Sequence, residues 1–465
     1  PIAQALAETA DRLGLIAGGF EIGFELEIPG HANNSSSDKQ TVRYSGSRPR
    51  MLRLFASPNL LTPDFIYEPA VFNDLSRRVR AIKPSPTLAV SNLASQLRAQ
   101  GRDVIGLGAG EPDFDTPKHI RDAAIEAIHN GDTHYTAVDG TAALKQAIID
   151  KFKRDNGLSY QADQILVSCG GKQSFFNLCQ ALLDAGDEVI IPAPYWVSYP
   201  DIVILADATP VIVETGIASE FKITADMLEA AITPKTRMLV LNSPSNPTGV
   251  GYSMAELKAL GEVLLRYPDV LIMTDDMYEL IVWGDYKFCN ILNACPELYD
   301  RTMVFNGVSK AYAMTGWRIG YAAGDAGIIK AMKKIQSQST SNPASVSQAA
   351  SVAALNGDHA PVRAMVEEFR KRHDYLVAEL NSIRYIECIE SHGTFYSFPN
   401  IQAFIDSRED LNNDVDVANL LLEEVGVALV PGSAFGAEGY MRISFATSME
   451  NLEKAVARIR QVFEG

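Results

Sequence analysis

The sequence is poor in cysteine and has no long uninterrupted apolar run. It contains five cysteines, an odd number, and no CxxC pair. A disulfide framework is therefore not expected, and a reducing compartment fits best. The stretch that comes closest to a membrane span, EVIIPAPYWVSYPDIVIL at 188–205, is broken by prolines and polar residues. It predicts a strand, a loop and a helix in succession.

Positive charge is also scarce, because the formal net charge at pH 7 is -16. This balance argues against a nucleic-acid groove or an anionic membrane surface as the main partner. The seven histidines form no HExxH motif and no paired ligand spacing, so no metal site is expected. The remaining composition is ordinary for a globular protein, and 465 residues suggest two or three domains.

The first 75 residues differ from the rest of the chain. They join a Ser/Asn-rich stretch to an arginine-rich one, and we expect a flexible extension. An organellar transit peptide is the alternative, but Glu21, Glu25 and Glu27 count against it because such peptides avoid acidic residues. A cytoplasmic location is therefore favoured.

From residue 76 onward, apolar β-branched runs alternate with segments of helical spacing. Examples are QILVSCGG before KQSFFNLCQALLDAG, and TRMLVLN before SMAELKALGEVLLRYP. This alternation predicts an α/β fold whose large domain has a mainly parallel sheet with helices on both faces. Beyond residue 360, long helices and shorter strands indicate a smaller α+β domain.

A glycine turn between a strand and a helix is the first candidate binding motif. In VSCGGKQ, the backbone N–H groups at Gly171 and the amine of Lys172 are suited to an anion such as phosphate. The plainer interpretation is a tight turn that needs glycine. The motif is neither GxGxxG nor GxxxxGK[ST], which argues against dinucleotides and nucleoside triphosphates.

Two further strand ends carry polar side chains. Asn246 lies in NSPSNPTG, and Asp275 and Tyr278 lie in TDDMYE. Each motif alone also suits a structural role, as a tight loop or a helix cap. Parallel strands, however, present their carboxyl ends at one edge of the sheet, where open α/β sheets bind ligands.

The segment SKAYAMTGWR adds Ser309, Lys310 and Arg318. Taken together, the motifs provide a phosphate cradle, a carboxylate, amide and phenol donors, a lysine amine and an arginine. This set suits pyridoxal phosphate, because its aldehyde bonds to a lysine and its pyridine nitrogen needs an acidic partner. An exposed basic loop is the alternative for this segment taken alone.

Residues 76–465 resemble the class I aminotransferases of fold type I, and within them the bacterial-type aspartate and aspartate–prephenate aminotransferases. GAGEPDFDTP, GGKQ, PYWVSYP, NSPSNPTG, DDMYE, NGVSKAYAMTGWRIGY and MRISFATS occur in that family's order. The resemblance implies a small domain formed by 76–118 and 371–465, and a large pyridoxal-phosphate-binding domain at 119–370. It also implies a homodimer with shared active sites, whose small-molecule substrates are amino acids and 2-oxo acids.

The resemblance also implies residue roles. Lys310 forms the covalent bond to the cofactor, Asp275 pairs with its ring nitrogen, and Tyr278 contacts its ring oxygen. Arg442 in MRISFATS grips the substrate α-carboxylate, which Gly110 also contacts. The other implied cofactor contacts are Gly171, Lys172, Trp196, Asn246, Ser309 and Arg318, with Tyr135 reaching the neighbouring subunit's site. The substrate-binding set further includes Trp196, Asn246, Lys172 and Lys83.

The expected reaction is transamination of L-aspartate and 2-oxoglutarate to oxaloacetate and L-glutamate, and in some members of prephenate to arogenate. Lys172 matches a position used for acidic side chains and Lys83 one tied to prephenate, although both also suit a generic charge. Other chemistry on the same cofactor, such as β-elimination, and a non-catalytic binding protein of this fold are the alternatives. The chain departs from the family pattern at Ala137 and Thr394.

Overall fold

The computed structural model describes residues 23–25, 51–53, 75–84 and 86–465. The predicted N-terminal extension therefore lies mostly outside the described residues. Within residues 1–75, strands β1 (Gly23–Glu25) and β2 (Met51–Arg53) pair in parallel. Residues 76–465 form a separate compact unit, to which the remainder of the description applies.

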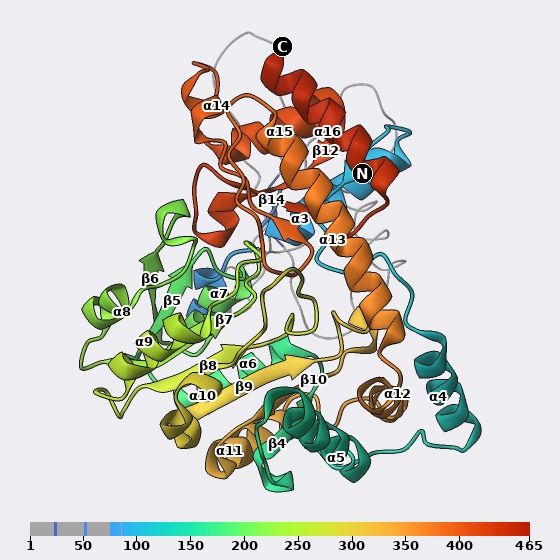
Figure 1. Ribbon diagram of the computed structural model, residues 1–465, viewed down its shortest axis with the longest axis vertical. Coiled ribbons are helices and arrows are strands. Elements are labelled where there is room, and N and C mark those ends of the chain that lie inside the picture. Colours follow the sequence, from blue (N-terminus) through green and yellow to red (C-terminus); the bar gives the residue numbers. More distant parts are fainter. Residues whose placement is uncertain (1–22, 26–50, 54–74, 85) are drawn as a thin grey trace. The chain divides into compact units, whose positions relative to one another are not determined.

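A seven-stranded sheet forms the base of this unit (Figure 1). Its strand order is β4-β10-β9-β8-β7-β5-β6, and every pairing is parallel except the two made by β10. The prediction of a mainly parallel sheet is confirmed. The strands are β4 (Ile165–Ser168), β5 (Glu188–Ala193), β6 (Thr209–Glu214), β7 (Thr236–Asn242), β8 (Leu271–Asp275), β9 (Thr302–Gly307) and β10 (Gly320–Ala323).

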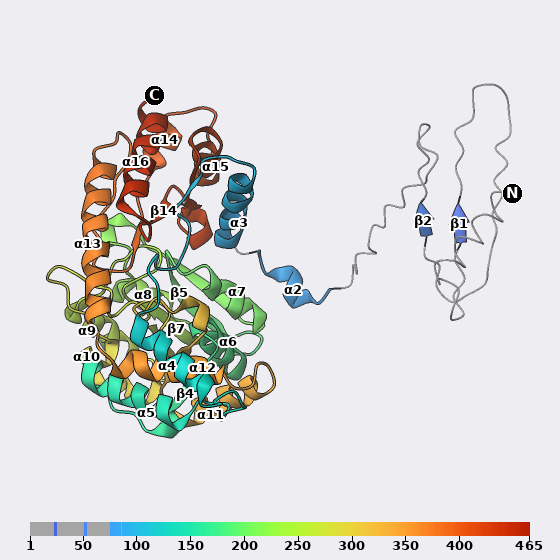
Figure 2. The ribbon, with the colours of Figure 1, turned by 90° about the vertical axis from the view of Figure 1, so that its right-hand side faces the viewer.

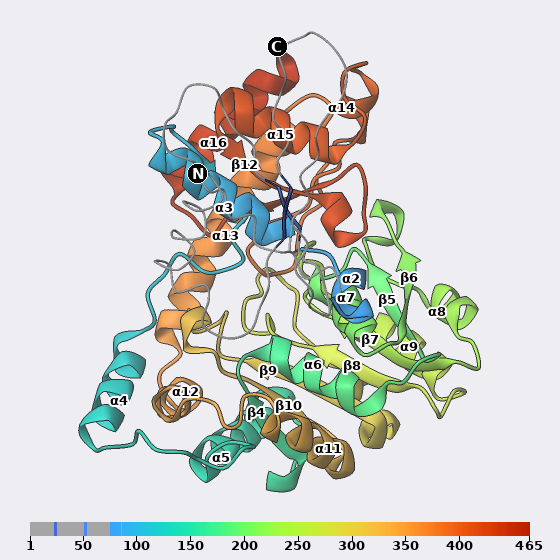
Figure 3. The same cartoon turned by 180° about the vertical axis from the view of Figure 1, so that it is seen from behind.

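Alternate residues of each strand enter different apolar cores, because side chains in a strand point to opposite faces. In β4, for example, Leu166 packs with one core while Ile165 and Val167 pack with the other. Helices α6 (Gly171–Leu182), α7 (Ser198–Leu205) and α11 (Ala326–Ser337) cover the first face (Figure 3). The second face is covered by α5 (Ala142–Lys151), α9 (Met254–Leu264), α10 (Ile291–Ala294) and α12 (Ser345–Asn356), and α4 (Lys118–His129) packs on α12.

Shorter strands and longer helices form the remainder of the unit. Helix α13 (Ala360–Asn381) runs beside α16 (Met449–Glu464), as Figure 2 shows. A three-stranded antiparallel sheet has the order β11-β14-β13, and β12 pairs in parallel with β3. Their bounds are β3 (Ile105–Gly106), β11 (Tyr396–Ser397), β12 (Val427–Ala428), β13 (Val430–Pro431) and β14 (Met441–Ser444). The other helices are α2 (Arg77–Ala81), α3 (Pro86–Ala99), α8 (Ala225–Ala231), α14 (Gln402–Asp406) and α15 (Asp414–Val425).

Local sequence signals set several helix starts. Ser253 begins α9 with a reciprocal capping box to Glu256, and Thr141 caps α5. Within the described part of the chain, no helix has the length and apolar character needed to cross a membrane. The same residues contain no cluster of three or more His, Cys, Asp or Glu side chains suited to a metal ion.

Candidate active site

One edge of the large sheet collects most of the predicted site residues. Asp275 is the last residue of β8, Asn246 lies in the loop after β7, and Lys310 follows the end of β9. Gly171 begins α6 directly after β4. Arg318 reaches the same edge from the opposite direction, because it precedes β10, which runs antiparallel to its neighbours. The strand topology thus explains how residues up to 147 positions apart in sequence share one site.

The Lys310 side chain points into this edge. Its Nζ donates a hydrogen bond to the carbonyl oxygen of Gly110, which comes from the loop before α4. Burial, together with the positive charges of Arg442 and Arg318, lowers the pKa of Lys310 to about 8. An amine with that pKa is partly neutral near physiological pH, so it is able to accept a proton or attack a carbonyl carbon.

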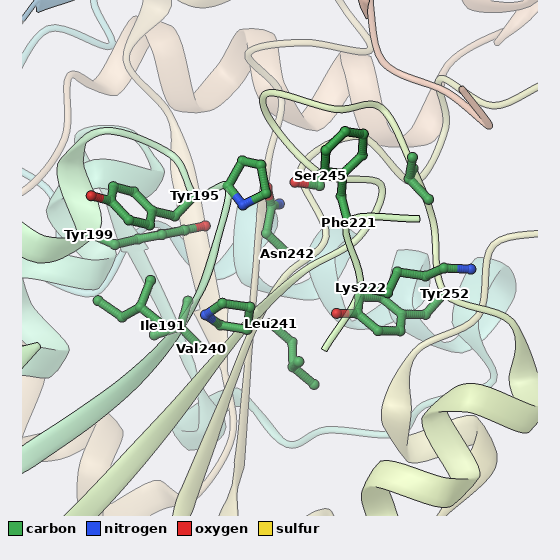
Figure 4. Close-up of a pocket in the computed structure, with 13 residues that line it drawn as sticks. Ile191, Tyr195, Tyr199, Phe221, Lys222, Val240, Leu241, Asn242, Ser245 and Tyr252 are labelled. Atoms are coloured by element: carbon green, nitrogen blue, oxygen red, sulfur yellow. The ribbon is translucent and has the colours of Figure 1, made fainter. Parts of the chain in front are cut away.

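The Asp275 carboxylate is held by hydrogen bonds on both oxygens. Tyr199 Oη donates to Oδ2 at 2.7 Å, and the Met277 backbone N–H donates to Oδ1 at 3.3 Å. The Asn242 side chain donates to the Asp275 carbonyl at 2.8 Å. Figure 4 shows Tyr199 and Asn242 in the adjoining pocket at the ends of β5 and β7. Burial raises the pKa of Asp275, so a cationic partner at this position would be strongly favoured.

Tyr278 lies one turn beyond Asp275, and it meets the smaller sheet. Its hydroxyl is 3.1 Å from that of Tyr396 on β11, and both side chains are buried. Burial raises the pKa of Tyr278 well above its usual value, so the phenol keeps its proton. Two residues before Tyr396, Thr394 has a φ of 70° and accepts a hydrogen bond from the Tyr396 N–H. Thr394, at which the chain departs from the family pattern, therefore lies beside the site.

Arg442 is a buried guanidinium with an incomplete set of partners. It donates to Asn246 Oδ1 at 3.0 Å and to the Gly108 carbonyl at 2.7 Å, while its Nε, also buried, has no partner among the residues that the structure describes. Its side chain lies over the ring of Tyr396 at 4.5 Å and forms no ion pair with a carboxylate of the described residues. A buried, uncompensated arginine is costly unless a ligand supplies the anion.

The glycine turn and Arg318 are in close contact. Gly170 has a φ of 90°, and a Cβ at that position would collide with the Arg318 guanidinium. Arg318 Nη2 donates to the Cys169 carbonyl at 3.3 Å. Helix α6 begins at Gly171 and so directs its free N–H groups toward this region. The arrangement suits a small dianion, because a helix N-terminus and a guanidinium both favour negative charge.

Lys172, Trp196 and Ser309 lie beside this cradle. Lys172 Nζ is 5.1 Å from the centroid of the Trp196 ring. Burial and the charge of Arg318 lower the pKa of Lys172. Ser309 is buried next to Lys310, and its carbonyl accepts a hydrogen bond from the Met314 N–H.

Two predicted residues make no described contact with this cluster. Lys83 is exposed, and its backbone N–H donates to Asp201 on α7 at 3.4 Å. The Tyr135 side chain is 92% exposed. The roles suggested for both remain predictions.

Three site residues were missed by sequence reasoning, namely Tyr199, Asn242 and Tyr396. Tyr199 and Asn242 lie inside PYWVSYP and NSPSNPTG, which had drawn attention for other residues, and Tyr396 lies two residues after Thr394. Asn242 and Tyr396 lie at strand ends, which was the available signal for them, whereas Tyr199 lies in the first turn of α7. What the sequence lacked was the direction of each side chain.

Comparison with known proteins gives a consistent result. The family described as aminotransferase class I and II matches residues 102–459. The chain is 63% identical over 390 residues to the aspartate/prephenate aminotransferase of Nitrosomonas europaea, covering 83% of this chain and 98% of the relative. It is 53% identical over 395 residues to that of Cereibacter sphaeroides, covering 84% and 99%.

Solved structures agree with these sequence matches. The aspartate aminotransferase of Rhizobium meliloti is similar with a TM-score of 0.81 and 49% identity, covering 84% of this chain and 98% of that one. The Thermus thermophilus aspartate aminotransferase with maleate is similar with a TM-score of 0.78 and 42% identity, covering 83% and 99%.

Proposed function

This chain belongs to the class I and II aminotransferase family, and from that premise we propose that it transfers the amino group of L-aspartate to 2-oxoglutarate with pyridoxal phosphate. Prephenate is proposed as a second acceptor. The observation that carries the proposal is the buried Arg442 guanidinium, which pairs with no carboxylate in the described part of the chain and adjoins Asn246 at the edge that holds Lys310. A substrate α-carboxylate would complete its pairing.

The residues at the sheet edge fit the proposed cofactor. When bound, pyridoxal phosphate supplies an attachment point for an amino group and a ring that accepts electron density from the substrate α-carbon. Asp275 would hold the ring nitrogen, Tyr278 and Asn246 the ring oxygen, and Trp196 the ring face. Gly171, Lys172, Ser309 and Arg318 would hold the phosphate, with Tyr135 of a second copy. The close approach of Arg318 to the Gly170 turn supports this cradle.

Lys310 is proposed to move the proton in the reaction. Its Nζ would act first as a base and take a proton from the substrate α-carbon. It would then act as an acid and return a proton to the cofactor carbon that is bonded to the transferred nitrogen. The lowered pKa of about 8 supports the base role. Arg442 and the Gly110 backbone would orient the α-carboxylate, so that the carbon to be deprotonated faces Lys310.

The second carboxylate of the substrate is assigned to lysines. Lys172 is the candidate beside Trp196, and Lys83 is the candidate for prephenate. A similar enzyme, that of Thermus thermophilus, was solved with maleate, which is a dicarboxylate. We further propose that residues 76–118 and 371–465, which carry Gly110 and Arg442, close as a small domain on the large domain at 119–370.

Replacing Arg442 should weaken substrate binding without removing the cofactor. Arg442→Lys is expected to lower kcat/KM for aspartate and for 2-oxoglutarate by about 10²-fold, because a lysine cannot pair with a carboxylate at two points. Steady-state kinetics and a pyridoxal phosphate titration measure the two effects. Arg408→Lys on the surface should change neither, and equal kinetics in both variants would exclude the assigned role.

The Lys310 pKa predicts a pH dependence of folding. Because the folded pKa of about 8 lies below the usual 10.5, the folded protein binds fewer protons than the unfolded chain between these values. The cofactor-free wild type should therefore gain up to about 3 kcal/mol relative to Lys310→Met as the pH rises through this window. Urea unfolding at several pH values measures it. A constant difference between the two proteins would contradict a depressed pKa.

Product analysis tests the proposed reaction. The purified enzyme with pyridoxal phosphate, L-aspartate and 2-oxoglutarate should form oxaloacetate and L-glutamate in equal amounts, detected by chromatography. Prephenate in place of 2-oxoglutarate should give arogenate. Ammonia and pyruvate from a β-substituted amino acid, with no glutamate from aspartate, would support β-elimination instead. Failure to bind the cofactor would favour a non-catalytic protein of this fold.

A further inference from the structure

The turn after β8 has two chemically different sides. Residues three apart in a turn share a face, so Asp275 and Tyr278 lie on one side, and Asp276 and Glu279 on the other. Asp275 and Tyr278 point toward Tyr199 and Tyr396, as described above. Asp276 and Glu279 are instead buried away from the site, with exposed fractions of 3% and 6%. One face of this turn therefore meets the candidate active site, and the other face meets the protein interior.

Glu279 belongs to a buried cluster with Lys151 and Asn156. Lys151 is the last residue of α5, is 1% exposed, and forms an ion pair with Glu279. Lys151 Nζ also donates to Asn156 Oδ1 at 2.6 Å, and Asn156 Nδ2 donates to Glu279 Oε2 at 2.7 Å. The three side chains therefore form a closed ring of polar contacts. We call Lys151, Asn156 and Glu279 the anchor cluster.

Asp276 is fixed separately from the anchor cluster. Asn290, the N-cap of α10, donates its amide to Asp276 Oδ2 at 2.6 Å and to Thr274 Oγ1 at 3.0 Å. Asn293 on the same helix donates to the Asn156 carbonyl at 2.8 Å. The turn is therefore tied to both α5 and α10. Buried polar networks of this kind rigidify the segment that they hold.

The anchor cluster also adjoins the strand that leads to Lys310. Lys151 and Glu279 line a narrow gap, too small for a water molecule, together with Asn306 and Gly307 at the end of β9, and with Ala311, the neighbour of Lys310. A shift of Glu279 would therefore disturb both strand ends that carry reacting groups. Small misplacements of such groups are costly, because proton transfer and charge stabilisation depend on their geometry.

We propose that Lys151, Asn156 and Glu279 are positioning residues, which hold Asp275 and Tyr278 in place for the cofactor and the reaction. The proposal rests on the proposed function, since it assigns that site its internal support. None of the three residues needs to touch the cofactor or substrate. Lys151 acts through Glu279, which pulls the far side of the turn toward α5.

Helix α5 supplies a matched pair of variants. Lys151→Met removes the anchor cation and leaves Glu279 buried without its counter-ion, which strongly disfavours the present arrangement of the turn. Lys145→Met removes a similarly buried lysine from the same helix, where it pairs with Asp139 at 2.7 Å. Asp139 keeps a second partner, because Lys333 also contacts it at 2.8 Å. A general loss of α5 stability would affect both variants alike.

Two measurements on the full chain distinguish positioning from general stability. Hydrogen exchange without cofactor should accelerate about tenfold or more at Met277, Glu279 and Ile281 in Lys151→Met but not in Lys145→Met. The N–H groups of these residues bond within the turn. The dissociation constant of pyridoxal phosphate should rise about 10- to 100-fold in Lys151→Met alone, as losses of supporting partners do elsewhere.

A third variant covers the case in which Lys151→Met does not fold. Lys151→Met combined with Glu279→Gln removes both charges, while the amide still accepts from Asn156. The double variant should fold, and it should lose less cofactor affinity than Lys151→Met does. If Lys151→Met is unfolded, the comparison is made with Glu279→Gln alone, which should lose more cofactor affinity than the double variant. Equal exchange rates and equal cofactor affinity in Lys151→Met and Lys145→Met would overturn the proposal, as would a double variant more impaired than Glu279→Gln. If the wild type binds no cofactor, the proposed function fails, while the exchange comparison still tests the anchor cluster.

Discussion

Lys310→Ala is expected to lower turnover by about 10⁴-fold or more, the upper range for loss of a proton-transferring group. The Lys310 amine lies at the carboxyl-end edge of the large sheet, where it donates a hydrogen bond to the Gly110 carbonyl oxygen, and its pKa is lowered to about 8. Alanine leaves no group there to move a proton at the substrate α-carbon. The visible absorption of lysine-bound pyridoxal phosphate should disappear as well. Stopped-flow kinetics and an absorption spectrum measure both losses.

Two controls accompany this prediction. Lys334→Ala removes an exposed lysine from α11 and should retain both turnover and absorption. Lys172→Ala removes the other amine of the site and should retain the absorption band while weakening phosphate or substrate binding. If Lys310→Ala kept the band and Lys172→Ala lost it, the covalent role would belong to Lys172.

Asp275→Asn is expected to lower kcat/KM for aspartate by about 10²- to 10³-fold, the usual cost of losing one pre-positioned charge. The carboxylate is held by Tyr199 and the Met277 N–H, so it needs no reorganisation to pair with a cationic ring nitrogen. Asparagine preserves the shape but not the charge. Single-turnover kinetics with saturating cofactor isolate the chemical step from cofactor affinity.

Tyr199→Phe provides the graded comparison. It removes one hydrogen bond to Asp275 and keeps the carboxylate, so the rate should fall by about tenfold. The rate is therefore expected to decrease from the wild type to Tyr199→Phe and then to Asp275→Asn. An Asp275→Asn enzyme as fast as the wild type would show that the charge at this position does not assist the reaction.

The sheet and the position of the site were predictable from sequence for a physical reason. Apolar β-branched runs fix buried parallel strands, and the carboxyl ends of such strands meet at one edge. Asp275 ends one of these strands, and Asn246 and Lys310 follow two others, so their proximity required only the strand direction. Arg318 was harder, because it belongs to this edge only through the antiparallel direction of β10.

The supporting residues were not predictable in the same way. Lys151 ends helix α5, and a lysine in a helix usually faces solvent, yet this one is buried against Glu279. Sequence spacing does not show which distant acid meets it. Thr394 is a similar case, since a β-branched residue at a φ of 70° is set by tertiary contacts rather than by local preference. The roles of Lys83 and Tyr135 stay predictions.

A spectral titration tests the central claim most directly. Purified protein is titrated with pyridoxal phosphate, followed by L-aspartate and then prephenate, while the absorption spectrum is recorded. We predict a band from lysine-bound cofactor, its loss with L-aspartate as the cofactor takes the amino group, and its return with prephenate. A cofactor band that L-aspartate leaves unchanged would contradict the claim that this chain transfers the amino group of aspartate.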